Sequence, residues 1–241
     1  MICAIHQLHY MPWIRYIHKM ACADVFVVLD DIQYNKNGWQ NRNRIKGPQG
    51  PFLLTVPVHG GYQQTLDEVR VDNRGRWAGK HAKALRMNYE SAGFYAEHEG
   101  FLSSVYSRRW GRLNDINWEM LRYLASALGL RARMVRSSEL GTEGDATERL
   151  VSICRAVGAD TYVTGAYAVK VYLDVPLMER AGLRLLYQRF ECPEYPQRYE
   201  ASGFVPDLSI WDMLLMCGPR TLEIIESAGG VDTTLPADVS A

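Results

Sequence analysis

The sequence lacks several features that would assign its class at once. Its 241 residues balance 27 Lys and Arg against 27 Asp and Glu, and this zero net charge argues against a general nucleic-acid-binding protein. The five cysteines include no CxxC pair, which disfavours a zinc ribbon or a disulfide framework. No apolar run approaches the ~18 residues of a membrane span. The opening MICAIHQLHYMPW lacks the basic start of a signal peptide. We therefore expect a cytoplasmic protein with reduced thiols and with no membrane or nucleic-acid partner.

The pattern that is present is an alternation of strands and helices. Residues 1–5 have the pattern of a short buried strand, Pro12 suits the start of a helix, and DVFVVLDD is an apolar strand ended by two acids. From Leu113 onward helical and strand patterns alternate again. This order predicts an α/β fold of three layers with a mostly parallel sheet. We expect a single domain over residues 1–230 and a flexible tail over residues 231–241.

Residues 50–112 interrupt this rhythm and are expected to form an insertion. FLLTVPV and LDEVRVD alternate on either side of a Gly-Gly-Tyr turn at residues 60–62, which is typical of a β-hairpin. WAGKHAKALRMNYESAG follows with the spacing of an amphipathic helix. The insertion is therefore predicted to combine a hairpin with helical structure outside the main sheet.

The first candidate site lies where the first strand ends and the first helix begins. His6, Gln7 and His9 stand at this junction. Ligands of open α/β sheets bind beyond the carboxyl ends of strands, and a helix N-terminus favours phosphate or carboxylate. We interpret His6 as a candidate proton carrier, with Gln7 and His9 as candidate substrate contacts. The alternative is that both histidines merely satisfy hydrogen bonds of the loop.

The second candidate site is the polar stretch DDIQYNKNGWQNRNRIKG at residues 30–47. Asp30 and Asp31 end the second strand, where a carboxylate would bind an amine or a hydroxyl group. Arginine forks match phosphate or carboxylate, amide groups match a sugar, and aromatic faces allow stacking. The alternative is a solvated loop whose surface charges contribute only about 0–1 kcal/mol. The candidate ligand contacts in this stretch are Tyr34, Trp39, Gln40, Asn41, Arg42, Arg44 and Lys46.

Two later motifs supply the remaining candidates. In WAGKH, Lys80 is a candidate phosphate contact and His81 a candidate acid–base group. In TGAYAVKVYLD, Gly165 allows a ligand to approach the backbone closely, and Tyr172 follows it in the next helix. The alternatives are a hydrogen-bonded core histidine, because His81 shares a helical stripe with Trp77, and an ordinary strand-to-helix connection at Gly165. No metal-ligand spacing stands out.

The segment IHQLHYMPWIRYIHKMACADVFVVLDDIQYNKNGWQNRNRIKG is similar to the opening of the WbqC-like family. ERLVSICRAVGADTYVTG and SIWDMLLMCG fit the same family, so the resemblance covers roughly residues 2–226. The family usually has Pro-Asn where Leu8 and His9 stand here, and Gly in place of Arg15. Because the family usually occurs among genes for O-antigen and other surface polysaccharides, the resemblance implies a role in polysaccharide or natural-product assembly. It also implies an action on an amino sugar or a related amine.

The leading hypothesis is a transferase that moves an acyl or aminoacyl group to the amine of a nucleotide-linked amino sugar. Arg42, Arg44 and Lys46 would hold phosphate or carboxylate, His6 would move a proton, and Asp30 or Asp31 would position the amine. One alternative is an ATP-dependent adenylating enzyme, since nucleotidylyltransferases place histidines at the same point of the fold. Another is a non-catalytic nucleotide-sugar-binding protein. The sequence assigns no cofactor and no oligomeric state to this small-molecule-binding protein.

Overall fold

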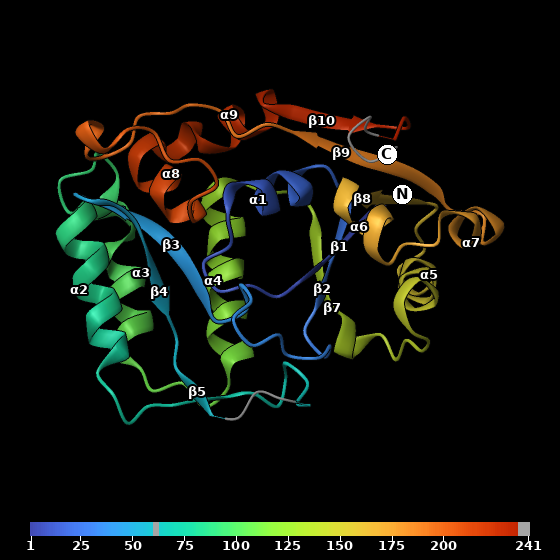
Figure 1. Cartoon of the computed structure of the whole chain (residues 1–241), viewed down its shortest axis with the longest axis horizontal. Helices are drawn as coiled ribbons and strands as arrows, with labels where there is room; N and C mark the ends of the chain where they lie inside the picture. The colour runs from blue at the N-terminus through green and yellow to red at the C-terminus, as the bar shows by residue number, and fades with distance from the viewer. Residues whose placement is uncertain (60–62, 236–241) are drawn as a thin grey trace.

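A computed structural model, which describes residues 1–59 and 63–235, contains a six-stranded sheet with the strand order β10–β9–β8–β1–β2–β7 (Figure 1). Adjacent strands run parallel except β9 and β10, which are antiparallel. The prediction of a mostly parallel sheet is therefore confirmed. The strands are β1 (Ile2–Gln7), β2 (Val25–Leu29), β7 (Arg133–Arg136), β8 (Thr161–Thr164), β9 (Arg184–Phe190) and β10 (Gly229–Asp232).

Two apolar cores lie on opposite faces of this sheet and give the fold its three layers. Alternate residues of β1 and β2 point to opposite faces, so that Ala4 and Phe26 join one core whereas Cys3 and Val25 join the other. The first core is covered by α1 (Ile14–Ala21), α4 (Leu113–Leu128), α8 (Ile210–Cys217) and α9 (Thr221–Ser227). The second is covered by α5 (Ala146–Ala156), α6 (Ala166–Val171) and α7 (Val175–Arg180).

The strand order reverses direction between β1 and β8. The chain runs from β1 outward through β2 to β7, and then returns to the other side of β1 as β8 before continuing to β9 and β10. The connections that leave β1 and β8 therefore diverge at the carboxyl ends of these two strands. Such a topological switch point opens a crevice where ligands bind in α/β proteins.

The insertion follows β2 and contains a hairpin that differs in position from the predicted one. Strand β3 (Arg42–Gly47) pairs with β4 (Gly50–Thr55), so the longer hairpin begins within the polar stretch. A short ladder of β5 (Val58–His59) and β6 (Arg70–Val71) joins the two segments expected to pair. The predicted turn at residues 60–62 lies outside the described residues. Helices α2 (Trp77–Tyr89) and α3 (Tyr95–Ser107) complete the insertion beside α8, remote from α5 and α7 (Figure 1).

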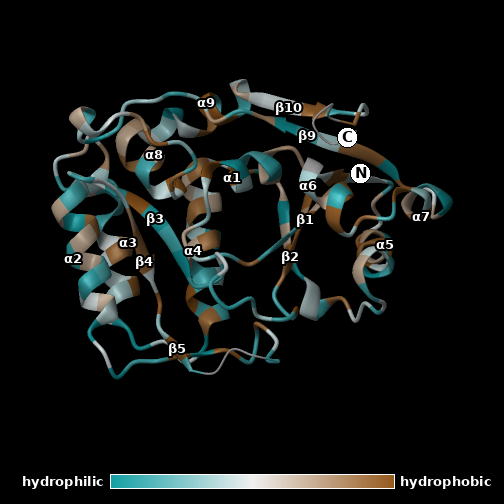
Figure 2. Cartoon of the chain, viewed as in Figure 1, coloured by the Kyte–Doolittle hydropathy of each residue, from teal (hydrophilic) through white to brown (hydrophobic). Residues whose placement is uncertain are grey.

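The alternative of a solvated loop does not describe β3 and the residues before it, because part of this polar stretch is buried. Although β3 is mainly hydrophilic (Figure 2), Gln40 and Asn43 are buried. Side-chain hydrogen bonds explain this burial, since Asn43 Nδ2 donates to the carbonyl oxygen of Met11 at 2.6 Å. Buried polar groups are tolerated when they are paired in this way.

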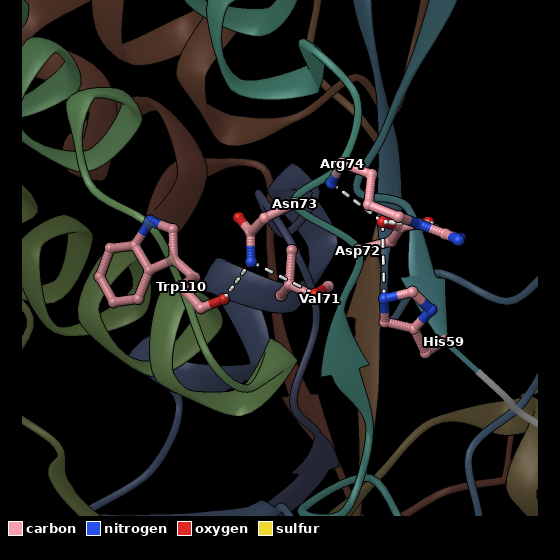
Figure 3. A network of polar contacts seen from close by, with 6 residues as sticks. All are labelled: His59, Val71, Asp72, Asn73, Arg74 and Trp110. Atoms are coloured by element: carbon pink, nitrogen blue, oxygen red, sulfur yellow. Dashed lines mark hydrogen bonds and ion pairs between the residues drawn. The ribbon is translucent and has the colours of Figure 1, made fainter.

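A small polar network fixes the chain where the insertion returns to α4 (Figure 3). Asp72 accepts the backbone N–H of Arg74 at 3.0 Å and lies 3.5 Å from His59 Nε2. Asn73 Nδ2 donates to the carbonyl oxygen of Trp110 at 2.7 Å. The Arg74 side chain holds the pKa of Asp72 below its ordinary value. The network ties β5 and β6 to the segment that begins α4.

The remaining regular elements of the described residues are three short 3-10 helices, η1 (Ser137–Glu139), η2 (Glu200–Ser202) and η3 (Gly218–Arg220). Strand β10 includes residues 231 and 232, the first two of the segment expected to be a tail. Across residues 1–59 and 63–235, every helix is too short or too polar to cross a bilayer.

Candidate functional site

A cavity of about 770 Å³ opens at the carboxyl ends of β1 and β8. Its volume falls within the range of small-molecule sites. The wall comes from β1, α1, the segment after β2 and the N-terminal ends of α5 and α6, so the switch point and the cavity coincide. The predicted site residues that line it are His6, Gln7, His9, Asp31, Trp39, Gly165 and Tyr172.

The inner wall of the cavity is a cluster of basic and aromatic side chains from β1, α1 and the loop between them, formed by His6, His9, Tyr16 and Lys19. The His6 ring lies 4.8 Å from the His9 ring and 4.6 Å from the Tyr16 ring, measured between centroids. Lys19 Nζ donates to the carbonyl oxygen of Ile5 at 2.9 Å. These four residues form one continuous surface, which we call the inner wall.

Burial sets the protonation of the inner wall. The pKa of His6 is lowered well below its ordinary value by burial and then by His9 and Lys19. Burial also lowers the pKa of His9 to about 3 and that of Lys19 to about 8. At neutral pH both imidazoles are therefore uncharged and Lys19 is mainly cationic. Because His6 Nδ1 lies 3.2 Å from the carbonyl oxygen of Gln7, which can only accept, Nε2 is the acceptor of the neutral His6 ring.

A second group of polar side chains in the cavity comes from the segment after β2 and from α5. Arg149 donates to Asp31 Oδ2 at 2.6 Å, and Ser137 Oγ donates to Asp31 Oδ1 at 2.5 Å. Arg149 stands near the beginning of α5, and Asp145, the N-cap residue, makes no side-chain capping bond. The first N–H groups of α5 therefore add positive partial charge beside Arg149. This edge of the cavity combines a carboxylate that suits a cation with a helix end that suits phosphate.

The two neighbouring acids at the end of β2 have different environments. Asp31 lines the cavity, whereas the Asp30 side chain is buried and accepts from Ser137 Oγ, the backbone N–H of Ser138 and Ser138 Oγ. Of the two acids proposed to position an amine, Asp30 does not line the pocket, because consecutive side chains leave a strand end in different directions. Asp31 is the acid available to a ligand.

Several residues of the polar stretch support the cavity without lining it. Gln40 Nε2 donates to Gln7 Oε1 at 3.3 Å and thereby orients a lining amide. The Arg44 guanidinium lies 5.8 Å from the centre of the Trp39 ring and donates to the carbonyl oxygen of Asp207 at 3.5 Å. Arg42 Nε donates to the carbonyl oxygen of Gly38. The expected convergence of both arginines on the pocket is not observed, because neither lines the cavity.

The other predicted contacts lie farther from the cavity. Asn41 Nδ2 donates to the carbonyl oxygen of Val56, and the backbone N–H of Tyr34 donates to Gln64. Lys46 is buried and its ammonium donates to Gln197 Oε1 and to the carbonyl oxygen of Gly203. These contacts account for the positions of the three residues, and none of the three lines the cavity.

The WAGKH motif also lies outside the cavity. His81 is buried in the first core, where its Nδ1 lies 2.8 Å from Tyr10 Oη, and burial lowers its pKa to about 4. Lys80 is exposed on α2. The surroundings of His81 are thus those of a hydrogen-bonded core histidine, since the buried face of α2 packs into the first core.

Sequence reasoning missed part of the cavity wall, chiefly Trp13, Tyr16, Lys19, Arg149 and Gln188. A signal for Lys19 was present, because it follows Tyr16 by three residues on a helix and residues at this spacing share a face. Arg149 stands in the first two turns of a helix that begins after a strand, where ligand contacts are common. Among the described residues, no group of three or more His, Cys, Asp or Glu side chains is arranged to hold a metal ion.

The fold is that of a doubly wound α/β protein with a cavity at its switch point. The chain belongs to the WbqC-like protein family, which matches residues 7–224. It is 34% identical over 219 residues to the uncharacterized protein Rv1507c of Mycobacterium tuberculosis (strain ATCC 25618 / H37Rv), covering 89% of this chain and 93% of that protein. No solved structure matches the chain.

Proposed function

We propose that this protein is a transferase that moves an acyl or aminoacyl group to the amine of a nucleotide-linked amino sugar, in the assembly of a polysaccharide or a glycosylated metabolite. The observation that carries the proposal is a cavity of about 770 Å³ that joins the neutral His6 to the Asp31–Arg149 pair. The family's association with polysaccharide genes supports the class of substrate.

The lining residues have the properties that amine acylation requires. The Asp31 carboxylate would attract the substrate ammonium group, which loses one proton to solvent to become the nucleophilic amine. Nε2 of His6 would accept the second proton as the amine nitrogen attacks the acyl carbonyl carbon, and would pass it to the departing group. Collapse of the tetrahedral intermediate would then expel the group that carried the acyl chain. The N-terminal end of α5 and Arg149 replace Arg42, Arg44 and Lys46 as the proposed contacts for the nucleotide phosphates.

The test combines ligand binding with turnover. Nucleotides, nucleotide-linked amino sugars and activated acyl donors are screened by thermal shift, and the pairs that bind are incubated together and examined by mass spectrometry for an acylated sugar. His6→Gln should lower turnover by about 10²–10⁴-fold, as expected for loss of a general base. His59→Gln, which changes a histidine outside the cavity, is the matched control.

Two outcomes would overturn the proposed transferase. Unchanged turnover in His6→Gln would remove the assigned base. Binding of nucleotide sugars without acylation by any donor would favour the non-catalytic binding protein instead.

An ATP-dependent adenylating enzyme is the second candidate. His6 and His9 lie at the β1–α1 junction beside the crevice where doubly wound proteins bind nucleotides. Release of pyrophosphate from ATP in the presence of a carboxylic acid would support this candidate, and its absence alongside acyl transfer would exclude it.

A further inference from the structure

Two polar atoms of the inner wall are buried without a hydrogen-bond partner. His9 and Tyr16 are 4% and 1% exposed, yet no described residue pairs with His9 Nδ1 or Tyr16 Oη. Both residues line the cavity. Buried polar groups of folded proteins are nearly always paired, so two unpaired atoms in neighbouring residues of one cavity point to a ligand that completes them.

Lys19 is the third incomplete group of the same wall. Lys19 is only 7% exposed, and among the described residues its ammonium group donates to one acceptor, the carbonyl oxygen of Ile5. In the described part of the chain, no Asp or Glu forms an ion pair with it. A buried ammonium group normally has a counter-ion, and two of its three N–H donors remain available.

The backbone holds these three groups on one surface. Tyr16 and Lys19 are three residues apart on α1 and therefore share a face, which is directed toward β1 and β8. His9 belongs to the preceding loop, in which Met11 has a φ of 48°, an unusual value for a residue with a Cβ. Asn43 supports this loop by donating to the carbonyl oxygens of Tyr10 and Met11. The strained loop is thus anchored to β3 with His9 facing the cavity.

We propose that the inner wall is a subsite for a carboxylate carried by the substrate, with the Lys19 ammonium as counter-ion and Tyr16 Oη and His9 Nδ1 as hydrogen-bond donors. The inference deepens the proposed function and rests on it only in assigning the carboxylate to a substrate. The three residues line one cavity and offer three kinds of donor with one positive charge, which suits a monoanion.

Charge matching favours a carboxylate over a phosphate at this position. Burial keeps the His9 imidazole neutral and the Tyr16 phenol protonated, because it lowers the pKa of His9 and raises that of Tyr16. Among these three residues, Lys19 therefore supplies the one positive charge that balances the anion. A phosphate with about two negative charges would be better served by Arg149 and the N-terminal end of α5 on the other side of the cavity.

The carboxylate could belong to a sugar acid or to a small carboxylic or amino acid, and ligand pairs separate these sources. D-Glucuronate is compared with glucose, which lacks the carboxylate, and acetate and glycine represent the acyl side. Inorganic phosphate tests the charge argument. Binding is measured by calorimetry, and the titration of Lys19 is followed by NMR of the protein labelled with ¹³C at lysine Cε, with the Lys19 signal assigned through Lys19→Met.

Bound carboxylate should raise the Lys19 titration midpoint from near 8 by about one unit or more, because an opposite charge stabilises the ammonium form. Lys19→Met should weaken carboxylate binding at least about tenfold, and Tyr16→Phe about threefold to tenfold. Lys83→Met and Tyr95→Phe, which lie outside the cavity, are the matched controls and should bind as the wild type does.

Two results would overturn the subsite. One is an unchanged Lys19 titration with every carboxylate, and the other is phosphate binding that depends on Lys19 at least as strongly as carboxylate binding does. Either result leaves acyl transfer by His6 untouched. Conversely, a carboxylate effect on Lys19 together with full turnover in His6→Gln would preserve the subsite and overturn the proposed transferase.

Discussion

Two lysines are buried in the described part of the chain, and their surroundings differ. Lys46, within the insertion, is 1% exposed and donates to Gln197 Oε1 at 3.1 Å and to the carbonyl oxygen of Gly203 at 2.6 Å. Lys19, at the switch point, is 7% exposed, donates to the carbonyl oxygen of Ile5 and faces a cavity. The ammonium group of Lys46 thus has two acceptors, whereas that of Lys19 has one acceptor and lies beside a cavity.

The polar groups around Lys46 are paired with one another, whereas two of those around Lys19 are not. Near Lys46, Asp212 accepts from Tyr89 Oη at 2.6 Å and from Tyr195 Oη at 2.8 Å. The charge of Lys46 opposes the rise that burial gives to the pKa of Asp212. Near Lys19, His9 Nδ1 and Tyr16 Oη are unpaired among the described residues. A buried polar cluster that is complete stabilises the fold, and one that is incomplete beside a cavity indicates a ligand.

The sharpest test of this comparison is the same substitution at both lysines. Lys46→Met removes the donor to the carbonyl oxygen of Gly203, one of the two donors to Gln197 Oε1 and a cation near Asp212, so we expect it to lower the free energy of unfolding by about 3 kcal/mol. Lys19→Met removes a buried charge that lacks a counter-ion, so its effect should stay within about 1 kcal/mol. Urea unfolding of both variants measures the difference. Equal losses at the two positions would remove the distinction between the clusters.

Acid should destabilise the inner wall through His9. Its pKa is about 3 in the folded protein and 6.5 in the unfolded chain, so between these values the unfolded state binds the additional proton. The contribution of neutral His9 to stability is therefore complete above pH 6.5 and is lost as the pH falls toward 3. Between pH 7 and 5 the wild type should lose about 2 kcal/mol more than His9→Asn, the residue usual in the family. Parallel unfolding curves for the two proteins would contradict a buried neutral imidazole.

The sequence predicts the main sheet well because its strands and helices have strong local patterns. The apolar run of β2 and the proline before α1 indicate these elements before any tertiary contact is known. Strand β3 was missed because its burial depends on side-chain hydrogen bonds to distant backbone groups, such as those from Asn43 to Tyr10 and Met11. No local pattern of polar residues contains that information.

The cavity residues that stand at strand ends could be predicted from the sequence, whereas most of those on helices could not. His6, Gln7 and Asp31 line the cavity because strands β1 and β2 end beside the switch point. The choice between Asp30 and Asp31 depends on how the chain turns after β2 and on Ser137 and Ser138 more than 100 residues later. Lys19 was missed because its importance depends on β8 lying next to β1, which follows from strand order.

Alkaline pH should act on Lys19 in the opposite sense to acid on His9. Its pKa is about 8 when folded and 10.5 when unfolded, so between these values the unfolded state binds more protons and stability rises with pH. Relative to Lys19→Met, the wild type should gain about 1 kcal/mol between pH 8 and 9. Because other groups titrate in this range, the difference between the two proteins is the quantity to measure. A gain that disappears when D-glucuronate is bound would further support the carboxylate subsite.

The smallest expected effect is at the unpaired phenol. Tyr16→Phe removes a hydroxyl group that makes no hydrogen bond to any described residue, so the free energy of unfolding should change by less than about 0.5 kcal/mol. Tyr195→Phe, which removes a donor to Asp212, should cost about 1 kcal/mol or more. Chemical denaturation at neutral pH without ligand compares the two. A clear loss of stability in Tyr16→Phe would mean that its hydroxyl group has a partner within the folded chain, and the inner wall would then resemble the complete cluster around Lys46.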